Sequence, residues 1–163
     1  MATIRAHGIT ARLPAGFEGR IFIRPTVGEG VAHPVAHFAT FPLPNDVGDF
    51  GSGAVTLMGA SDVFATLFEY GPESVGTVLF SRQGRPRALT PGDFRRTLLR
   101  RALGGQAGTQ WFFTEAGRPF SFYAVLGSQA LGAQLVPLVN QLLASLTLSP
   151  ATPTTPVPAA LWN

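Results

Sequence analysis

The fold is decided by the sequence of residues 109–126, TQWFFTEAGRPFSFYAVL, in which two apolar runs flank a turn. Aromatic and β-branched residues suit a pleated, half-buried surface, so residues 109–114 and 120–126 are predicted to be strands. Residues 115–119 contain Gly and Pro and have the length of a hairpin connection. This stretch therefore predicts a β-hairpin.

The segment after this hairpin predicts a helix and then a short strand. The helix is expected to open at Ser128 or Gln129, and Pro137 is tolerable only near its first turns. Apolar residues follow at helical spacing, namely Leu135, Val136, Leu138, Val139, Leu142 and Leu143. Residues 145–148 are then typical of a strand.

The first part of the chain is predicted to consist of strands. Residues 9–13 alternate between apolar and polar types, and residues 20–24 form an apolar run flanked by charges. Because Pro-Ala-Gly separates them, we expect these two strands to form a hairpin. Residues 35–41 predict a third strand, and residues 54–57 a short fourth.

Two more helices are predicted in the middle of the chain. Ser61 or Asp62 is expected to cap a helix that ends at the Gly-Pro pair of residues 71–72, before a strand at residues 75–80. Thr90, followed by Pro and an acid, predicts a second helix start. The residues expected to face inward are Phe94, Leu98, Leu99 and Leu103, and those expected on the other side are Arg95, Arg96, Arg100 and Arg101. The predicted fold class is α+β, a mostly antiparallel sheet flanked by about three helices.

Composition limits the size and class of the protein. The chain has 163 residues, of which 45% are hydrophobic, which suffices for one core but not comfortably for two domains. The absence of Cys excludes disulfides, thiolate metal sites and thiol-based catalysis. No run approaches the roughly 18 apolar residues of a membrane helix, and the first residues lack the pattern of a secretory signal. We therefore expect a cytoplasmic protein without a membrane span.

Positive charge is concentrated in one segment. Residues 82–101 carry seven Arg and one acid, a net charge of +6, whereas the rest of the chain has five Arg and eight acids, a net charge of −3. The chain contains no Lys, which a GC-rich coding bias explains without any site. The Arg segment is interpreted as a solvated helix face, as a surface for an acidic protein partner, or as a nucleic-acid surface, although the usual features of nucleic-acid readers are missing.

Two stretches resemble the PsbP-like fold, which PsbP shares with Mog-type proteins, DcrB lipoproteins and the Eag-type chaperones of type VI secretion. Residues 13–20, LPAGFEGR, are similar to the Leu-Pro-x-Gly-aromatic turn between the opening strands of that family. Residues 117–126 together with 143–148 are similar to its ending of strand, helix and short strand. The resemblance implies an α/β/α sandwich and a non-catalytic binding or adaptor role, and it carries over no binding residue.

Candidate metal and catalytic residues do not form a recognisable site. His33 and His37 have helical metal spacing, but Pro34 and the strand pattern place them about 13 Å apart. Asp46 and Asp49 lack the acidic ladder of a calcium loop and are interpreted as part of a turn. Neither Ser52 nor Ser128 lies in a nucleophile elbow, so we expect no catalytic residue, metal or cofactor.

The chain is divided by composition into one domain over residues 1–148 and a Pro/Thr-rich tail over residues 149–163. Leu161 and Trp162 near the end of this tail suit a docking peptide, or alternatively fold back on the domain. The predicted function is a non-enzymatic adaptor for a protein partner. The candidate contact residues are Arg95, Arg96, Arg100, Arg101, Leu161 and Trp162. The alternatives are anion or nucleic-acid binding through residues 82–101, and a hydrolase with an unrecognised site.

Overall fold

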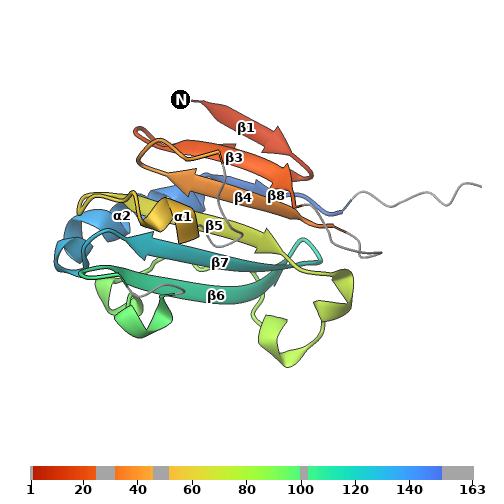
Figure 1. Cartoon of the computed structure of the whole chain (residues 1–163). Coiled ribbons are helices and arrows are strands. Elements are labelled where there is room, and N and C mark those ends of the chain that lie inside the picture. Colours follow the sequence, from red (N-terminus) through yellow and green to blue (C-terminus); the bar gives the residue numbers. More distant parts are fainter. Residues whose placement is uncertain (1, 25–31, 46–51, 100–102, 152–163) are drawn as a thin grey trace, which may run out of the picture.

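The structure is a computed structural model that describes residues 2–24, 32–45, 52–99 and 103–151. In these residues the chain forms two antiparallel β-sheets and one long helix (Figure 1). The strand order of the smaller sheet is β1 (Thr3–Ala6), β2 (Ile9–Arg12), β8 (Leu146–Leu148). The strand order of the larger sheet is β3 (Glu18–Ile23), β4 (Pro34–Ala39), β5 (Val63–Glu69), β7 (Arg118–Leu126), β6 (Ala107–Glu115).

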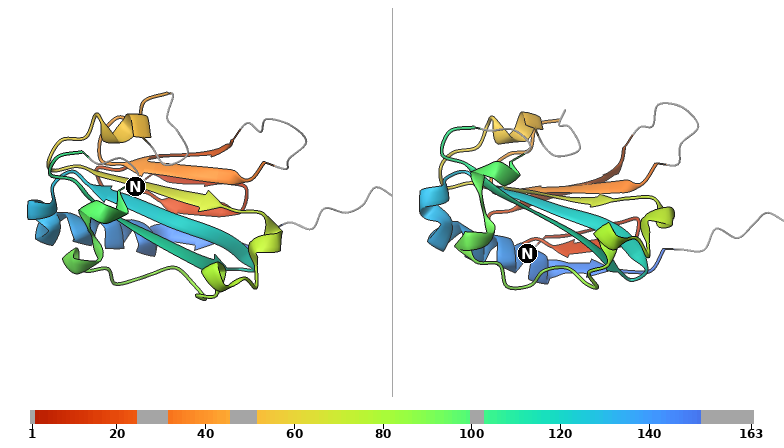
Figure 2. Two further views of the ribbon diagram at one scale, coloured as in Figure 1. Left: turned by 60° about the horizontal axis from the view of Figure 1, so that its bottom comes forward. Right: turned by 90° about the horizontal axis from the view of Figure 1, so that it is seen from below.

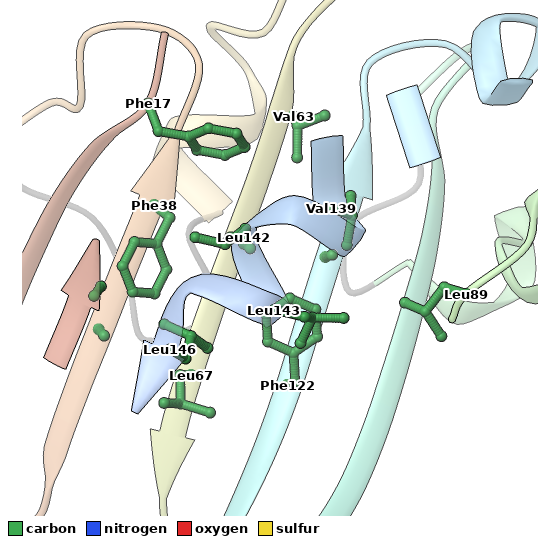
Figure 3. Close-up of a cluster of buried hydrophobic side chains, with 14 of the residues drawn as sticks. Phe17, Phe38, Val63, Leu67, Leu89, Phe122, Val139, Leu142, Leu143 and Leu146 are labelled. Atoms are coloured by element: carbon green, nitrogen blue, oxygen red, sulfur yellow. The ribbon is translucent and has the colours of Figure 1, made fainter. Parts of the chain in front are cut away.

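The main core lies between the two sheets and beneath the long helix α2 (Gly132–Ser145), which follows the short turn η5 (Gln129–Leu131). Figure 2 shows α2 and the three-stranded sheet on one side of the five-stranded sheet and the helical turn α1 (Ser52–Val55) on the other. The buried side chains of α2 have helical spacing and include Leu135, Val136, Val139, Leu142 and Leu143. Figure 3 shows Leu142 and Leu143 directed toward the larger sheet, in one cluster with Phe122.

The other face of the five-stranded sheet is covered by a second apolar cluster. Its buried members are Ala39, Phe41, Ala54, Val55, Phe64, Tyr123 and Val125. The central strands β5 and β7 are consequently buried along their whole length. A strand that is covered on both faces has a continuous run of apolar residues in its sequence, instead of an alternation of apolar and polar residues.

The predicted α+β class with about three flanking helices is wrong, because the described residues form eight strands and one long helix. The helix predicted after Asp62 is strand β5, whose seven residues are all buried. Val63, Ala65 and Leu67 face the main core, whereas Phe64 faces the second cluster. A short apolar run buried on both faces has no periodicity that separates a strand from a helix.

The Arg-rich helix predicted from Thr90 to residue 103 is also wrong. Its start has the predicted chemistry, since the Thr90 N–H donates to the Asp93 carboxylate at 2.8 Å, but it forms only the 3-10 turn η3 (Pro91–Asp93). The chain then becomes extended, because the N–H and C=O of Arg95 both pair with Gly108 on the edge of β6. A second 3-10 turn, η4 (Arg96–Leu98), follows. Leu98, which was expected to face inward, is exposed.

Three smaller predictions are corrected by the same structure. The strand predicted at residues 75–80 consists of the turn that follows η1 (Pro72–Ser74) and of η2 (Val78–Phe80), and the strand predicted at residues 54–57 overlaps α1. The first predicted hairpin is wrong because β2 and β3 belong to different sheets. Leu13 and Phe17 are buried on either side of the Pro14–Gly16 turn, so this turn carries the chain from one sheet to the other.

The remaining elements are confirmed. The hairpin of residues 109–126 is β6 and β7 in register, the third predicted strand is β4, and the last predicted elements are α2 and β8. Strand β1 was not predicted, because it is a four-residue edge strand with no buried side chain.

Candidate functional site

Two tight turns lie at one end of the sheets. His7 and Gly8 join β1 to β2 with φ of 51° and 75°, and Ala116 and Gly117 join β6 to β7 with φ of 54° and 73°. Two-residue loops with positive φ at both positions are favoured in hairpins because their twist matches that of the strands. The first turn belongs to the smaller sheet and the second to the larger one, and Gly8 and Gly117 line the same cleft.

Arg118 connects the two sheets at this end. Its Nε and Nη2 donate to the two carboxylate oxygens of Glu69 on β5, at 2.8 and 2.7 Å. Its remaining N–H groups donate to backbone carbonyls next to the strands of the smaller sheet. These are His7 at 2.9 Å and Gly8 at 3.3 Å in the β1–β2 turn, and Ser149 at 2.8 Å directly after β8. The guanidinium therefore uses all five of its donors, and both charges of the pair are 9% exposed or less.

A second arginine connects the sheets along their edges. The Arg85 guanidinium pairs with Glu115 of β6 at 2.6 Å and also donates to the carbonyl of Leu146 in β8 at 2.6 Å. The Arg85 N–H donates to the same carboxylate at 3.1 Å. Arg85 lies in the segment between η2 and η3 (Pro91–Asp93), outside both sheets. Its side chain satisfies the Leu146 carbonyl on the outer edge of β8, so this strand edge is partly covered.

An open cleft of about 980 Å³ surrounds the Arg118–Glu69 pair. Its walls are largely rigid and apolar, with Pro34, Pro72, Pro119, Pro150 and Ile23. His7, His33 and Glu73 supply its polar lining in addition to the ion pair. Glu73 is exposed and makes no ion pair within the described residues. The cleft therefore offers proline-lined walls and one uncompensated negative charge.

Next to the cleft, an apolar ridge projects into solvent, formed by Val75, Val78 and Leu79. Their exposed fractions are 39%, 90% and 57%. The backbone of the ridge is held by hydrogen bonds from Val75 to Pro72 and from Phe80 to Thr77, both 3.2 Å long. The ridge therefore has a fixed backbone and exposed apolar side chains.

Aromatic packing anchors the base of the ridge. The ring of Phe80 is buried and lies 5.1 Å from the ring of Tyr70 and 5.7 Å from that of Phe112. The Thr114 hydroxyl also donates to the carbonyl of Phe80 at 2.8 Å. These contacts attach the ridge to the larger sheet, and the ridge and the cleft share the segment that begins at Pro72.

The arginines predicted to form one contact surface are divided by the structure. Arg95 and Arg96 are exposed, but they lie on an extended segment and a 3-10 turn, not on a helix face. Arg82 stacks over Trp111, with its guanidinium carbon 5.0 Å from the ring centre, and Arg85 is used between the sheets. The other predicted contact residues, Arg100, Arg101, Leu161 and Trp162, lie outside the described residues.

The two histidines have different surroundings. His33 lines the cleft, whereas His37 is fully buried on β4 between the rings of Phe22 and Phe64, at 5.0 and 5.3 Å. Strand register places His37 in a row of mostly polar residues across the larger sheet, on the face covered by the second apolar cluster. The row runs Arg20, His37, Thr66, Tyr123, Gln110. No local sequence pattern predicts this row, because each member comes from a different strand.

The remaining candidate residues do not gather into a site. Among the described residues, no three His, Asp or Glu side chains are placed to hold a metal ion. Ser52 begins α1 and Ser128 precedes η5, and Asp46 and Asp49 lie outside the described residues.

Comparison with known proteins gives no match to any family model, curated protein or solved structure. The resemblance to the PsbP-like family therefore stays a prediction. Within the part of the chain that the structure describes, no helix has the length and apolar character needed to cross a membrane.

Proposed function

We propose that this chain is a non-enzymatic binding protein, located in the cytoplasm, that docks a protein partner on its apolar ridge and the adjoining cleft. The observation that carries the proposal is the 90% exposed side chain of Val78 on a segment whose backbone is hydrogen-bonded. Burial of a Val or Leu side chain is worth about 1.5–3 kcal/mol, so the ridge offers a partner several kcal/mol of apolar contact. Exposed apolar patches beside polar groups mark interaction surfaces in soluble proteins.

The chemistry of the cleft indicates what the partner presents. Proline walls favour apolar contact, and Glu73 adds a carboxylate that no described residue neutralises. We infer a partner surface with apolar side chains against the ridge and a Lys or Arg opposite Glu73. Complementary charge of this kind fixes the register of two surfaces more than it adds affinity.

The charged groups on the floor of the cleft support a binding role instead of catalysis. All five N–H groups of the Arg118 guanidinium donate to Glu69 or to backbone carbonyls, and both carboxylate oxygens of Glu69 accept from Arg118. Groups held in this way connect the sheets and have no donor left for a substrate. The contribution of Leu161, Trp162 and the remaining arginines to docking stays a prediction.

The test places a photo-crosslinking residue at position 78 in the full chain and, as a matched control, at position 57. Leu57 is an apolar residue of similar character, 60% exposed, two positions after the end of α1. Figure 1 shows α1 apart from the yellow-green turns of residues 72–80. We expect position 78 alone to crosslink one defined partner in the source cells. Crosslinking of the same proteins from both positions would contradict the proposal, as would crosslinking only to a second copy of this chain.

Binding of the purified partner then tests the ridge directly. Val78→Asp is expected to weaken binding at least tenfold, about 1.4 kcal/mol, because it inserts a charge into an apolar contact. Leu57→Asp should leave the affinity unchanged, and Glu73→Lys should weaken binding through like-charge repulsion. The free energy of unfolding of both Asp variants should lie within about 0.5 kcal/mol of that of the parent, because exposed positions contribute little to stability. Unchanged affinity of the Val78→Asp variant would refute docking on the ridge.

A further inference from the structure

The outward face of the three-stranded sheet carries a polar set that the docking surface does not use. Side chains of a strand alternate between its two faces. Ile9, Ala11, Leu146 and Leu148 are buried in the main core. Thr10, Arg12 and Thr147 therefore point away from it, and together with Thr3 and Arg5 of β1 they line a shallow hollow of about 650 Å³.

Strand register places these side chains in two adjacent rows. Arg5 lies opposite Thr10, which in turn lies opposite Thr147. Thr3 lies opposite Arg12. Arg5 and Arg12 are thus diagonal neighbours on one face, with backbones about 7–8 Å apart, and hydroxyl groups lie beside both of them.

The positive charge of this face is uncompensated. Strands β1, β2 and β8 contain no Asp or Glu. Within the described residues, neither Arg5 nor Arg12 makes an ion pair, and the hydroxyls of Thr3, Thr10 and Thr147 make no hydrogen bond. This differs from Arg85 and Arg118, whose guanidinium groups are taken up by carboxylates and carbonyls. Two neighbouring guanidinium groups repel unless an anion lies between them.

We propose that this face binds a tetrahedral oxyanion, the phosphate or sulfate group of a small ligand or the free ion. The guanidinium groups of Arg5 and Arg12 supply paired N–H donors that match the spacing of phosphate or sulfate oxygens. The hydroxyl of Thr10, between Arg5 and Thr147, supplies a further donor from the middle strand. The sheet fixes the backbone positions from which these side chains extend. Gly8 lines both this hollow and the cleft, but Arg5 and Arg12 do not line the cleft of the proposed docking surface.

The test is a titration of the full-length, isotope-labelled chain followed by amide NMR shifts. The probes are sodium phosphate, sodium sulfate and ribose 5-phosphate, each compared with sodium chloride at equal ionic strength. We expect saturable shifts confined to amides of β1, β2 and β8, and none with chloride. Tighter binding of ribose 5-phosphate than of inorganic phosphate identifies a phosphate ester as the ligand, and equal binding identifies the free ion. Shifts spread evenly over the chain, or equal shifts with chloride, would overturn the proposal.

Variants assign the effect to the two arginines. Arg5→Gln/Arg12→Gln should weaken oxyanion binding at least tenfold, and Thr10→Val, which keeps the side-chain shape, should weaken it two- to fivefold. Arg87→Gln/Arg96→Gln is the matched control, because it also removes two exposed arginines but leaves the three-stranded sheet intact. All these variants change outward-facing side chains, so far-UV circular dichroism should be unchanged. Equal loss of binding in the control would show a nonspecific charge effect and refute the site.

Discussion

Removal of the Arg118 side chain tests whether the two sheets depend on one guanidinium. The Arg118→Met variant leaves the Glu69 carboxylate buried without its partner, and it removes the Arg118 bonds to the carbonyls of His7, Gly8 and Ser149. The Gly8 carbonyl still accepts from the Ser149 N–H at 2.9 Å. The side chains of the pair are only 5% and 9% exposed, so water replaces these bonds poorly. The variant should therefore be far less stable than the loss of a surface arginine would suggest.

The magnitude follows from the burial of the pair. Breaking a buried ion pair by removing one partner costs about 3–5 kcal/mol, a large share of the roughly 5–15 kcal/mol that stabilises a domain. The Arg118→Met/Glu69→Met double variant contains no buried charge and loses mainly the three carbonyl bonds, each worth about 1 kcal/mol. It should consequently be more stable than the sum of the two single variants predicts, by at least about 2 kcal/mol.

Urea unfolding, followed by far-UV circular dichroism and tryptophan fluorescence, measures these differences. Arg96→Met is the matched control, because Arg96 is exposed and makes no ion pair within the described residues; its effect should stay within about 0.5 kcal/mol. Arg118→Lys keeps the charge without the planar fork and gives a measurable, intermediate loss if the Met variant does not fold. A loss below about 1 kcal/mol for Arg118→Met, or additive single variants, would refute this reasoning.

Three further predictions are tested in the same unfolding assay. Arg85→Met removes the pair with Glu115, and because both side chains are partly exposed we expect a smaller loss, about 1–2 kcal/mol. Gly8→Ala should lower the free energy of unfolding more than Gly117→Ala. Both residues have positive φ, which costs an alanine about 1–2 kcal/mol. Of the two, only Gly8 would have its added Cβ close to another side chain, 2.6 Å from a guanidinium nitrogen of Arg118. Leu142→Ala empties a fully buried position under the long helix and should cost about 2–5 kcal/mol.

Each of these expectations has a contradicting result. If Arg85→Met loses as much stability as Arg118→Met, the burial of an ion pair does not determine how much that pair contributes to stability. Equal losses for Gly8→Ala and Gly117→Ala would mean that the guanidinium moves aside freely. A Leu142→Ala loss comparable with that of an exposed leucine, such as Leu57→Ala, would contradict the packing of α2 on the sheet.

Elements with strong local signals could be predicted from the sequence. The strands of the β6–β7 hairpin are aromatic runs, although they extend to Glu115 and Arg118 and leave a two-residue turn in place of the predicted connection of residues 115–119. Helix α2 repeats its apolar residues at helical spacing over 14 residues. Such signals lie within one segment and need no knowledge of its neighbours. The start of η3 was likewise recognised at Thr90, although its continuation as a helix was wrong.

Elements whose conformation depends on distant segments could not be predicted. Residues 63–69 are apolar throughout, and only the clusters on both faces of the sheet make them a strand. Arg95 leaves a helical path because its backbone pairs with Gly108, which is 13 positions along the chain. Local preference is weak, and long-range hydrogen bonding and burial override it.

The candidate sites show the same division. The sequence alone determined that this chain is rich in apolar residues, with 13 Phe, and that it has no cysteine chemistry, a concentration of Arg between residues 82 and 101, and a Pro/Thr-rich end. Only the tertiary structure decided which arginines are exposed and which connect the sheets, because Arg118 and Glu69 are 49 residues apart and Arg118 and His7 are 111 apart. Charge and polarity are properties of each residue, whereas partners are set by strand pairing, and pairing depends on the whole chain at once.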